Sequence, residues 1–143
     1  MKRIQMRKGF TLIEIMVVII ILGLLAAFVI PNITGKSEEA KQKLVCIQMK
    51  SLNESLKMFK VDNGSYPANE EGLKALMENP NPSVYTSYSS NSYIEGKNLP
   101  KDPWNKPYIY LNTDEMVELI SLGADGKEGG KNEDRDQKLS ACR

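Results

Sequence analysis

The chain has 143 residues, with 19 Lys and Arg against 18 Asp and Glu, a formal net charge of +1, and no His. The near-neutral charge suggests no basic patch for nucleic acid, and the lack of His disfavours a zinc site or a Ser-His-Asp triad. The length is sufficient for one small domain with a modest core.

The first nine residues read as a basic leader. Residues 1–9 contain four Lys or Arg and no acid, which leaves a net charge of −3 on the other side chains. Cations before an apolar run are typical of a segment that stays on the cytoplasmic side of a membrane. A secretory signal has its small-residue cleavage site after the apolar region, whereas Gly9 lies before it.

Residues 10–31 are predicted to form a transmembrane helix. A helix of this length is about 33 Å long and can cross the roughly 30 Å hydrocarbon layer. Glu14 lies near its start, and an acid inside a membrane helix costs on the order of 3 kcal/mol. The carboxylate could pair with the N-terminal ammonium of a neighbouring subunit. The alternative is a plain signal anchor whose Glu14 reaches the lipid interface.

This N-terminal pattern resembles a known leader type. The string Gly9-Phe10-Thr11-Leu12-Ile13-Glu14, the apolar helix and Pro31 are similar to the class III leader of type IV pilins and type II secretion pseudopilins. The resemblance implies that a prepilin peptidase cuts after Gly9 and methylates the new amine of Phe10. It also implies that Glu14 guides assembly and that residues 10–31 build the core of a filament.

Residues 32–143 are predicted to form a periplasmic domain that includes the second half of the long helix. Residues 31–37 contain Pro and Gly and indicate a kink or a locally loosened helix. Helical spacing then resumes and ends at Asp62-Asn63-Gly64. An apolar stripe predicts packing on a small sheet, with a coiled coil as the alternative. The stripe consists of Val45, Met49, Leu52, Leu56 and Phe59, and the opposite face carries Lys43, Lys50, Glu54, Lys57 and Lys60.

Further elements follow in chain order. A short helix is expected around residues 73–77, and a polar, solvated loop at residues 83–93. Three prolines around Trp104 predict a rigid segment. Residues 108–111 and 116–120 are expected to be strands joined by a turn at residues 112–114. The predicted fold class is therefore α+β and pilin-like, with a long N-terminal helix packed on a small antiparallel sheet.

The motifs in this domain narrow the resemblance to the major pseudopilin of type II secretion. It covers residues 9 to about 136. The similar segments are Tyr66-Pro67, Glu71-Gly72-Leu73 with Ala75-Leu76, Leu99-Pro100-Lys101-Asp102-Pro103-Trp104, Pro107-Tyr108, and the stretch from Ser121 to Gly130.

An acidic, glycine-rich loop occupies residues 121–136. Between Asp125 and Asp136 it has five carboxylates and three glycines, a composition that suits either a solvated turn or a calcium site. An EF-hand does not fit, because Lys127 and Gly129 stand at ligand positions. The resemblance implies a structural calcium ion, although Arg135 and Gln137 depart from the family pattern. Its implied ligands are the side chains of Asp125, Asp134 and Asp136 and the carbonyls of Leu122 and Lys127.

Two cysteines, Cys46 on the long helix and Cys142 near the end of the chain, have two interpretations. Outside the cytoplasm they could form a disulfide that attaches the C-terminal tail to the helix. They could equally be free thiols, because sequence spacing does not settle the pairing.

The resemblance implies a structural subunit of the inner membrane, single-pass, with its C-terminal domain in the periplasm. Such a subunit leaves the lipid and polymerises with copies of itself into a pseudopilus that helps drive protein export across the outer membrane. The implied partners are minor pseudopilins, the prepilin peptidase, an inner-membrane assembly platform and an assembly ATPase, without direct contact to nucleic acid. The alternatives are a pseudopilin of a DNA-uptake system, a type IV pilus subunit, and a membrane-anchored enzyme, for which no clustered nucleophile or acid–base pair is evident.

Overall fold

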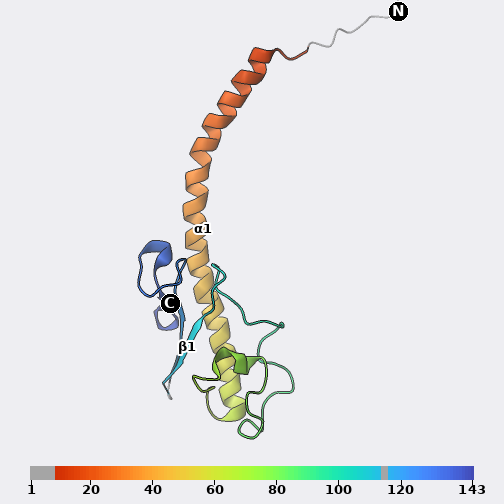
Figure 1. Cartoon of the computed structure of the whole chain (residues 1–143), viewed down its shortest axis with the longest axis vertical. Helices are drawn as coiled ribbons and strands as arrows, with labels where there is room; N and C mark the ends of the chain where they lie inside the picture. The colour runs from red at the N-terminus through yellow and green to blue at the C-terminus, as the bar shows by residue number, and fades with distance from the viewer. Residues whose placement is uncertain (1–8, 114–115) are drawn as a thin grey trace, which may run out of the picture. The chain divides into compact units, whose positions relative to one another are not determined.

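The computed structural model describes residues 9–113 and 116–143, with residues 28–36 described by their backbone. The main elements are helix α1 (Leu12–Asn63), the 3-10 helix η1 (Gly72–Leu76), and strands β1 (Ile109–Asn112), β2 (Val117–Ser121) and β3 (Gln137–Lys138) (Figure 1). Two further 3-10 helices are η2 (Asn132–Asp134) and η3 (Leu139–Ala141). The predicted α+β class, a long N-terminal helix with a small antiparallel sheet, is confirmed.

The chain divides into two compact units, one ending at Ser37 and the other comprising Glu38–Arg143. The boundary predicted between residues 31 and 32 separates a membrane segment from a periplasmic domain and stays a prediction. Helix α1 is helical without a break through Pro31 to Ser37, so the expected loosening does not interrupt it. The leader residues 1–8 lie outside the described residues.

The core of the second unit forms on the predicted apolar stripe of α1. Val45, Met49, Leu52, Leu56 and Phe59 are each at most 3% exposed. The other members of this cluster come from η1, from the sheet with the residue before it, and from the loop after η1, namely Leu73, Ala75, Leu76, Tyr85, Tyr108, Tyr110 and Leu119. Full burial of one such apolar side chain contributes about 1.5–3 kcal/mol. Burial of the five side chains of the stripe therefore strongly stabilises the packing of this half of α1 against the domain.

The sheet has the order β1-β2-β3, with both neighbouring pairs antiparallel. Strands β1 and β2 lie within one residue of their predicted positions and pair Tyr110 with Leu119. The connection includes a bond from the Thr113 amide to the Met116 carbonyl at 3.0 Å, whereas Asp114 of the predicted turn lies outside the described residues. Strand β3 was not predicted, because Gln-Lys carries no alternating apolar pattern; it pairs Gln137 with Ser121.

The tyrosines of the Ser/Tyr-rich loop correct the expectation of a solvated segment. Tyr85 is 5% exposed, and its ring centroid lies 5.0 Å from that of Phe59. Tyr88 and Tyr93 are half-buried, with their ring centroids 6.0 and 5.4 Å from Phe59. Burial, with the hydroxyl bonded to Glu71, raises the pKa of Tyr85 to about 12. The prediction was wrong for these residues because the last turns of α1 present an aromatic ring on which they pack.

Candidate functional site

The first candidate site is the start of α1, where Thr11 and Glu14 bond reciprocally. The Glu14 amide donates to Thr11 Oγ1 at 3.3 Å, and the Thr11 amide donates to Glu14 Oε2 at 3.5 Å. This is a capping box, which satisfies amides that have no partner inside the helix. Its signature in the sequence, which was not among the predictions, is the Thr-x-x-Glu spacing before an apolar run. Gly9 and Phe10 precede the helix and are exposed, so the backbone at the predicted cleavage point is accessible.

The helix that follows exposes large apolar side chains on all its faces. Between Leu12 and Leu25 their exposed fractions run from 46% at Val18 to 79% at Leu12. Continuous apolar exposure of this kind marks a surface that contacts lipid or other proteins. Among the residues whose side chains the structure describes (9–27, 37–113 and 116–143), no helix is long and apolar enough to cross a membrane.

The second candidate site, the acidic loop, starts from a buried hydrogen-bonded pair. The Ser121 hydroxyl at the end of β2 donates to Asp102 Oδ2 at 2.7 Å and accepts the Gly123 amide at 3.4 Å. Asp102 is 4% exposed, and its Oδ1 accepts the amides of Trp104 and Lys106 at 3.1 and 2.8 Å. The first residues of the loop are therefore fixed to the proline-rich turn around Trp104.

The same turn contacts the beginning of the second unit. Trp104 Nε1–H donates to Glu38 Oε2 at 3.1 Å. Glu38 also accepts from Lys41 Nζ at 2.9 Å, and chiefly this bond lowers the pKa of the Glu38 carboxyl. The predicted rigid segment thus connects α1 to the base of the acidic loop.

The two ends of the loop approach each other closely at Gly123. The Ala124 amide donates to the Glu133 carbonyl at 2.9 Å. Gly123 has a φ of 68°, and a Cβ at this position would lie 2.7 Å from the Glu133 carbonyl oxygen. A side chain would be excluded by both the backbone conformation and the contact, so glycine is required for the loop to close.

The aspartates predicted as calcium ligands lie in different environments. Asp125 is exposed, and its Oδ1 accepts the Lys127 amide at 3.0 Å. Asp134 and Leu122 are half-buried. Asp136 Oδ2 accepts the Gly129 amide at 2.9 Å, whereas its Oδ1 is buried without a hydrogen-bond partner.

The oxygen atoms of these predicted ligands meet some, but not all, of the requirements of a hard cation such as calcium. A buried carboxylate oxygen without a partner is costly unless something binds it, and Asp136 Oδ1 is such an atom. Among the described residues, however, no three His, Cys, Asp or Glu side chains converge to hold a metal ion. A calcium ion bound here would have to draw on backbone carbonyl oxygens as well as on carboxylates.

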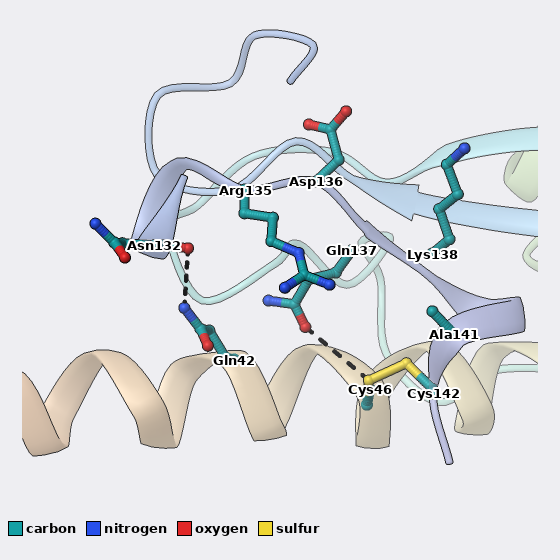
Figure 2. Close-up of a pocket in the computed structure, with 9 residues that line it drawn as sticks. All are labelled: Gln42, Cys46, Asn132, Arg135, Asp136, Gln137, Lys138, Ala141 and Cys142. Carbon is teal, nitrogen blue, oxygen red and sulfur yellow. Dashed lines mark hydrogen bonds between the residues drawn. A yellow bond between two sulfur atoms is a disulfide. The ribbon is translucent and has the colours of Figure 1, made fainter. Parts of the chain in front are cut away.

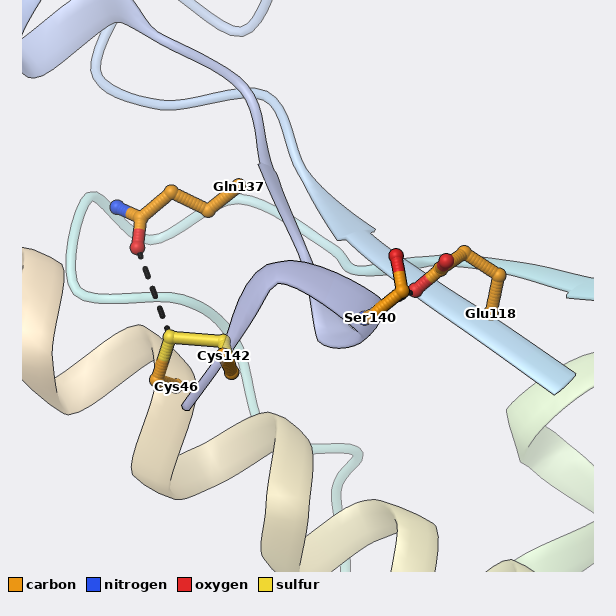
Figure 3. The surroundings of a disulfide bond; sticks show 5 residues. All are labelled: Cys46, Glu118, Gln137, Ser140 and Cys142. Carbon is orange, nitrogen blue, oxygen red and sulfur yellow. Dashed lines mark hydrogen bonds between the residues drawn. A yellow bond between two sulfur atoms is a disulfide. The ribbon is translucent and has the colours of Figure 1, made fainter.

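The end of the chain is attached to α1 beside this loop. Cys46 and Cys142 form a disulfide with a Cα–Cα distance of 5.5 Å, the pairing that the sequence left open (Figure 3). One helical turn earlier, Gln42 Nε2 donates to the Asn132 carbonyl at 3.0 Å. Gln42 and the disulfide line one pocket with residues 132 and 135–138, and Arg135 extends toward the helix (Figure 2).

Comparison with known proteins gives two family matches and close relatives. Residues 32–139 match the family described as type II secretion system (T2SS), protein G, and residues 4–30 match the prokaryotic N-terminal methylation motif. The type II secretion system core protein G of Vibrio cholerae is 43% identical over 133 residues, covering 92% of this chain and 90% of that protein. The protein of the same name from Pseudomonas aeruginosa is 45% identical over 136 residues, covering 92% and 94%.

A solved structure agrees with these relatives. The crystal structure of the major pseudopilin from the type 2 secretion system of enterohaemorrhagic Escherichia coli is similar with a TM-score of 0.61 and 30% identity, covering 76% of this chain and 93% of that one. The fold, the methylation motif and the sequence identity thus agree over nearly the whole chain. The chain belongs to the protein G family of the type II secretion system, the family of the major pseudopilins.

Proposed function

We propose that the chain is a structural subunit that polymerises with copies of itself into a periplasmic pseudopilus and helps to export proteins across the outer membrane. The observation that carries this proposal is the exposed apolar surface of α1 between Leu12 and Leu25, with Glu14 at its start. The family to which the chain belongs is structural, and the proposal assigns it no reaction.

Before assembly this apolar surface requires lipid, and after assembly it requires other subunits. Residues 10–31 are accordingly proposed as a single span of the inner membrane, with residues 32–143 in the periplasm. The prepilin peptidase would cut after Gly9 and methylate Phe10, as the match to the methylation motif suggests. A platform protein, an assembly ATPase and minor pseudopilins would be the other partners.

The second half of α1 offers further surface for subunit contacts. On the side away from the core, Leu44, Ile47, Met58 and Val61 are 43%, 64%, 58% and 77% exposed. They lie among the lysines predicted for this face, so it is less polar than the charge pattern suggested. Such a surface supports packing between subunits along the filament.

Glu14 is proposed to pair with the Phe10 ammonium of a neighbouring subunit, which would neutralise both charges in an apolar environment and set the axial step. Glu14→Ala should therefore leave processing at Gly9 intact and abolish or strongly reduce filaments. Mass spectrometry of the processed chain and electron microscopy of assembled fibres measure the two effects. Glu39→Ala, which removes an exposed acid elsewhere on α1, is the control. Normal filaments in Glu14→Ala would refute the pairing.

The acidic loop is proposed to hold a structural calcium ion. The ligands would be the side chains of Asp125, Asp134 and Asp136 and the carbonyls of Leu122 and Lys127. When bound, the calcium ion would link the two ends of the loop, because its positive charge attracts oxygen atoms from both. The partnerless Asp136 Oδ1 supports this assignment.

Thermal unfolding with calcium and with a chelator tests the calcium site. Binding to the folded state alone stabilises it by about 2.7 kcal/mol at a hundredfold excess over Kd, so the midpoint should rise by several degrees. Asp125→Ala should remove this response. Glu128→Ala takes a carboxylate from the same loop without touching an assigned ligand and should retain it. An identical midpoint for the unaltered chain in calcium and in chelator would refute the site.

A further inference from the structure

The second half of the acidic loop is fixed to α1 by two side chains one helical turn apart. Gln42 Nε2–H donates to the Asn132 carbonyl at 3.0 Å, and Cys46 forms the disulfide with Cys142. Because residues four apart lie on the same face of a helix, both contacts are made on one side of α1 (Figure 2).

These contacts bracket the segment that carries two of the proposed calcium ligands. Asp134 and Asp136 lie between Asn132 and Cys142, and β3 begins directly after Asp136. Asn132 has a φ of 55°, a left-handed conformation that Asn tolerates better than most residues. The chain thus turns at the residue whose carbonyl accepts both from Gln42 and from the Arg135 amide, at 3.0 and 3.3 Å.

The first half of the loop is fixed independently of α1 side chains at positions 42 and 46. It depends on Ser121, whose hydroxyl accepts the Gly123 amide and donates to the buried Asp102 carboxylate. The two halves also contact each other, through the bond from the Ala124 amide to the Glu133 carbonyl and through the pairing of Ser121 with Gln137. The distance between the carboxylates therefore depends on these contacts and on the supports of each half. A cation that binds oxygens from both segments gains affinity when the segments are already in place, because less ordering remains to be done.

We infer that Gln42 and the Cys46–Cys142 disulfide are positioning residues for the acidic loop, and that its affinity for a divalent cation depends on them. This inference rests on the proposed calcium site. The dependence is reciprocal: if the disulfide strengthens calcium binding, bound calcium stabilises the attached tail by the same factor.

The experiment uses the full processed chain in detergent micelles, in four forms. These are the unaltered chain, the Cys46→Ala plus Cys142→Ala double variant, Gln42→Ala, and the control Lys43→Ala, which changes an exposed neighbour of Gln42. Hydrogen exchange in chelator reports the loop without metal, at the amides of Gly129 and Asp136, which bond across the loop. Calorimetric titration with calcium chloride reports affinity.

The double variant should exchange these loop amides about tenfold faster and bind calcium about tenfold more weakly. Gln42→Ala should show a smaller change in the same direction, about threefold, and Lys43→Ala should match the unaltered chain. Amides of the buried turns around Leu52 and Leu56 serve as an internal check that the core remains folded.

Unchanged loop exchange and unchanged calcium affinity in a folded double variant would overturn the inference. If the double variant loses core protection, Gln42→Ala decides in its place, and unchanged values there overturn it. An unaltered chain that binds no calcium, with loop exchange still faster in the variants, would refute the calcium site while supporting the positioning of the loop by α1.

Discussion

At the residue scale, Asp102 is the group on which most local structure depends. Its two oxygens accept the amides of Trp104 and Lys106 and the hydroxyl of Ser121, and it is 4% exposed. A buried carboxylate is tolerated when its lone pairs are satisfied in this way. The sequence placed Asp102 in a family motif but gave no sign of this role, because its partner Ser121 lies on a strand far along the chain.

Asp102→Asn should lower the free energy of unfolding by about 2–4 kcal/mol. The amide oxygen can still accept the amides of Trp104 and Lys106, but the NH₂ then faces the Ser121 hydroxyl, which must stop donating and accept this bond together with that of the Gly123 amide. Chemical denaturation measures the change. Ser121→Ala, which removes one of the three bonds, should cost less, about 1–2 kcal/mol. Equal stability of Asp102→Asn and the unaltered chain would contradict this role.

The capping box at Thr11 and Glu14 is a second feature whose role was not predicted from the sequence. The free-energy cost of an acid in an apolar helix draws attention to Glu14. The structure adds a local role as a helix cap, which the Thr-x-x-Glu spacing also predicts. Thr11 and Glu14 satisfy each other's amides within one chain. If Glu14 pairs with a neighbouring ammonium in the filament, it must share or release the Thr11 amide during assembly.

At the element scale, segments with a clear helical or strand periodicity of apolar residues could be predicted. Segments that depend on contacts with distant residues could not. The stripe from Val45 to Phe59 repeats at helical spacing, and all five residues are buried as expected. Gly64, with a φ of 84° and its amide bonded to the Lys60 carbonyl, ends α1 where predicted. Strand β3 has two residues and depends on pairing with β2, so no local pattern reveals it.

The tyrosines that pack on Phe59, near the end of α1, should make the stability of the fold depend on alkaline pH. Burial first, and then the Glu71 carboxylate, raises the pKa of Tyr85 to about 12 in the folded chain. Burial also raises the pKa values of Tyr88, Tyr93, Tyr108 and Tyr110. An unfolded tyrosine has a pKa of about 10, so above that pH the unfolded chain loses protons that the folded chain keeps.

The free energy of unfolding should therefore be unaffected by these groups below about pH 10 and should fall as the pH rises toward 12. Denaturation midpoints measured on both sides of pH 10 test this expectation. Tyr85→Phe removes one ionisable group and should weaken the alkaline loss. A midpoint that stays constant through this range would show that the tyrosines titrate normally in the fold.

At the scale of the whole molecule, the family and the pilin-like fold could be predicted from the sequence because the motifs at both ends are specific. The match to the protein G family over residues 32–139 and to the methylation motif over residues 4–30 supports this interpretation. The disulfide could not be predicted, because pairing depends on where Cys142 lies relative to α1. The acidic loop could be located, whereas the arrangement of its carboxylates depends on contacts from Gln42, Cys46 and Ser121.

The most direct test of the central claim is a deletion of the gene in its own host, with protein export and DNA uptake measured in parallel. A pseudopilus subunit of type II secretion predicts that exported proteins accumulate in the periplasm while DNA uptake is unchanged. The unaltered gene should restore export, and the Glu14→Ala form should not. Normal export together with lost DNA uptake would contradict the account and assign the chain to a competence machine.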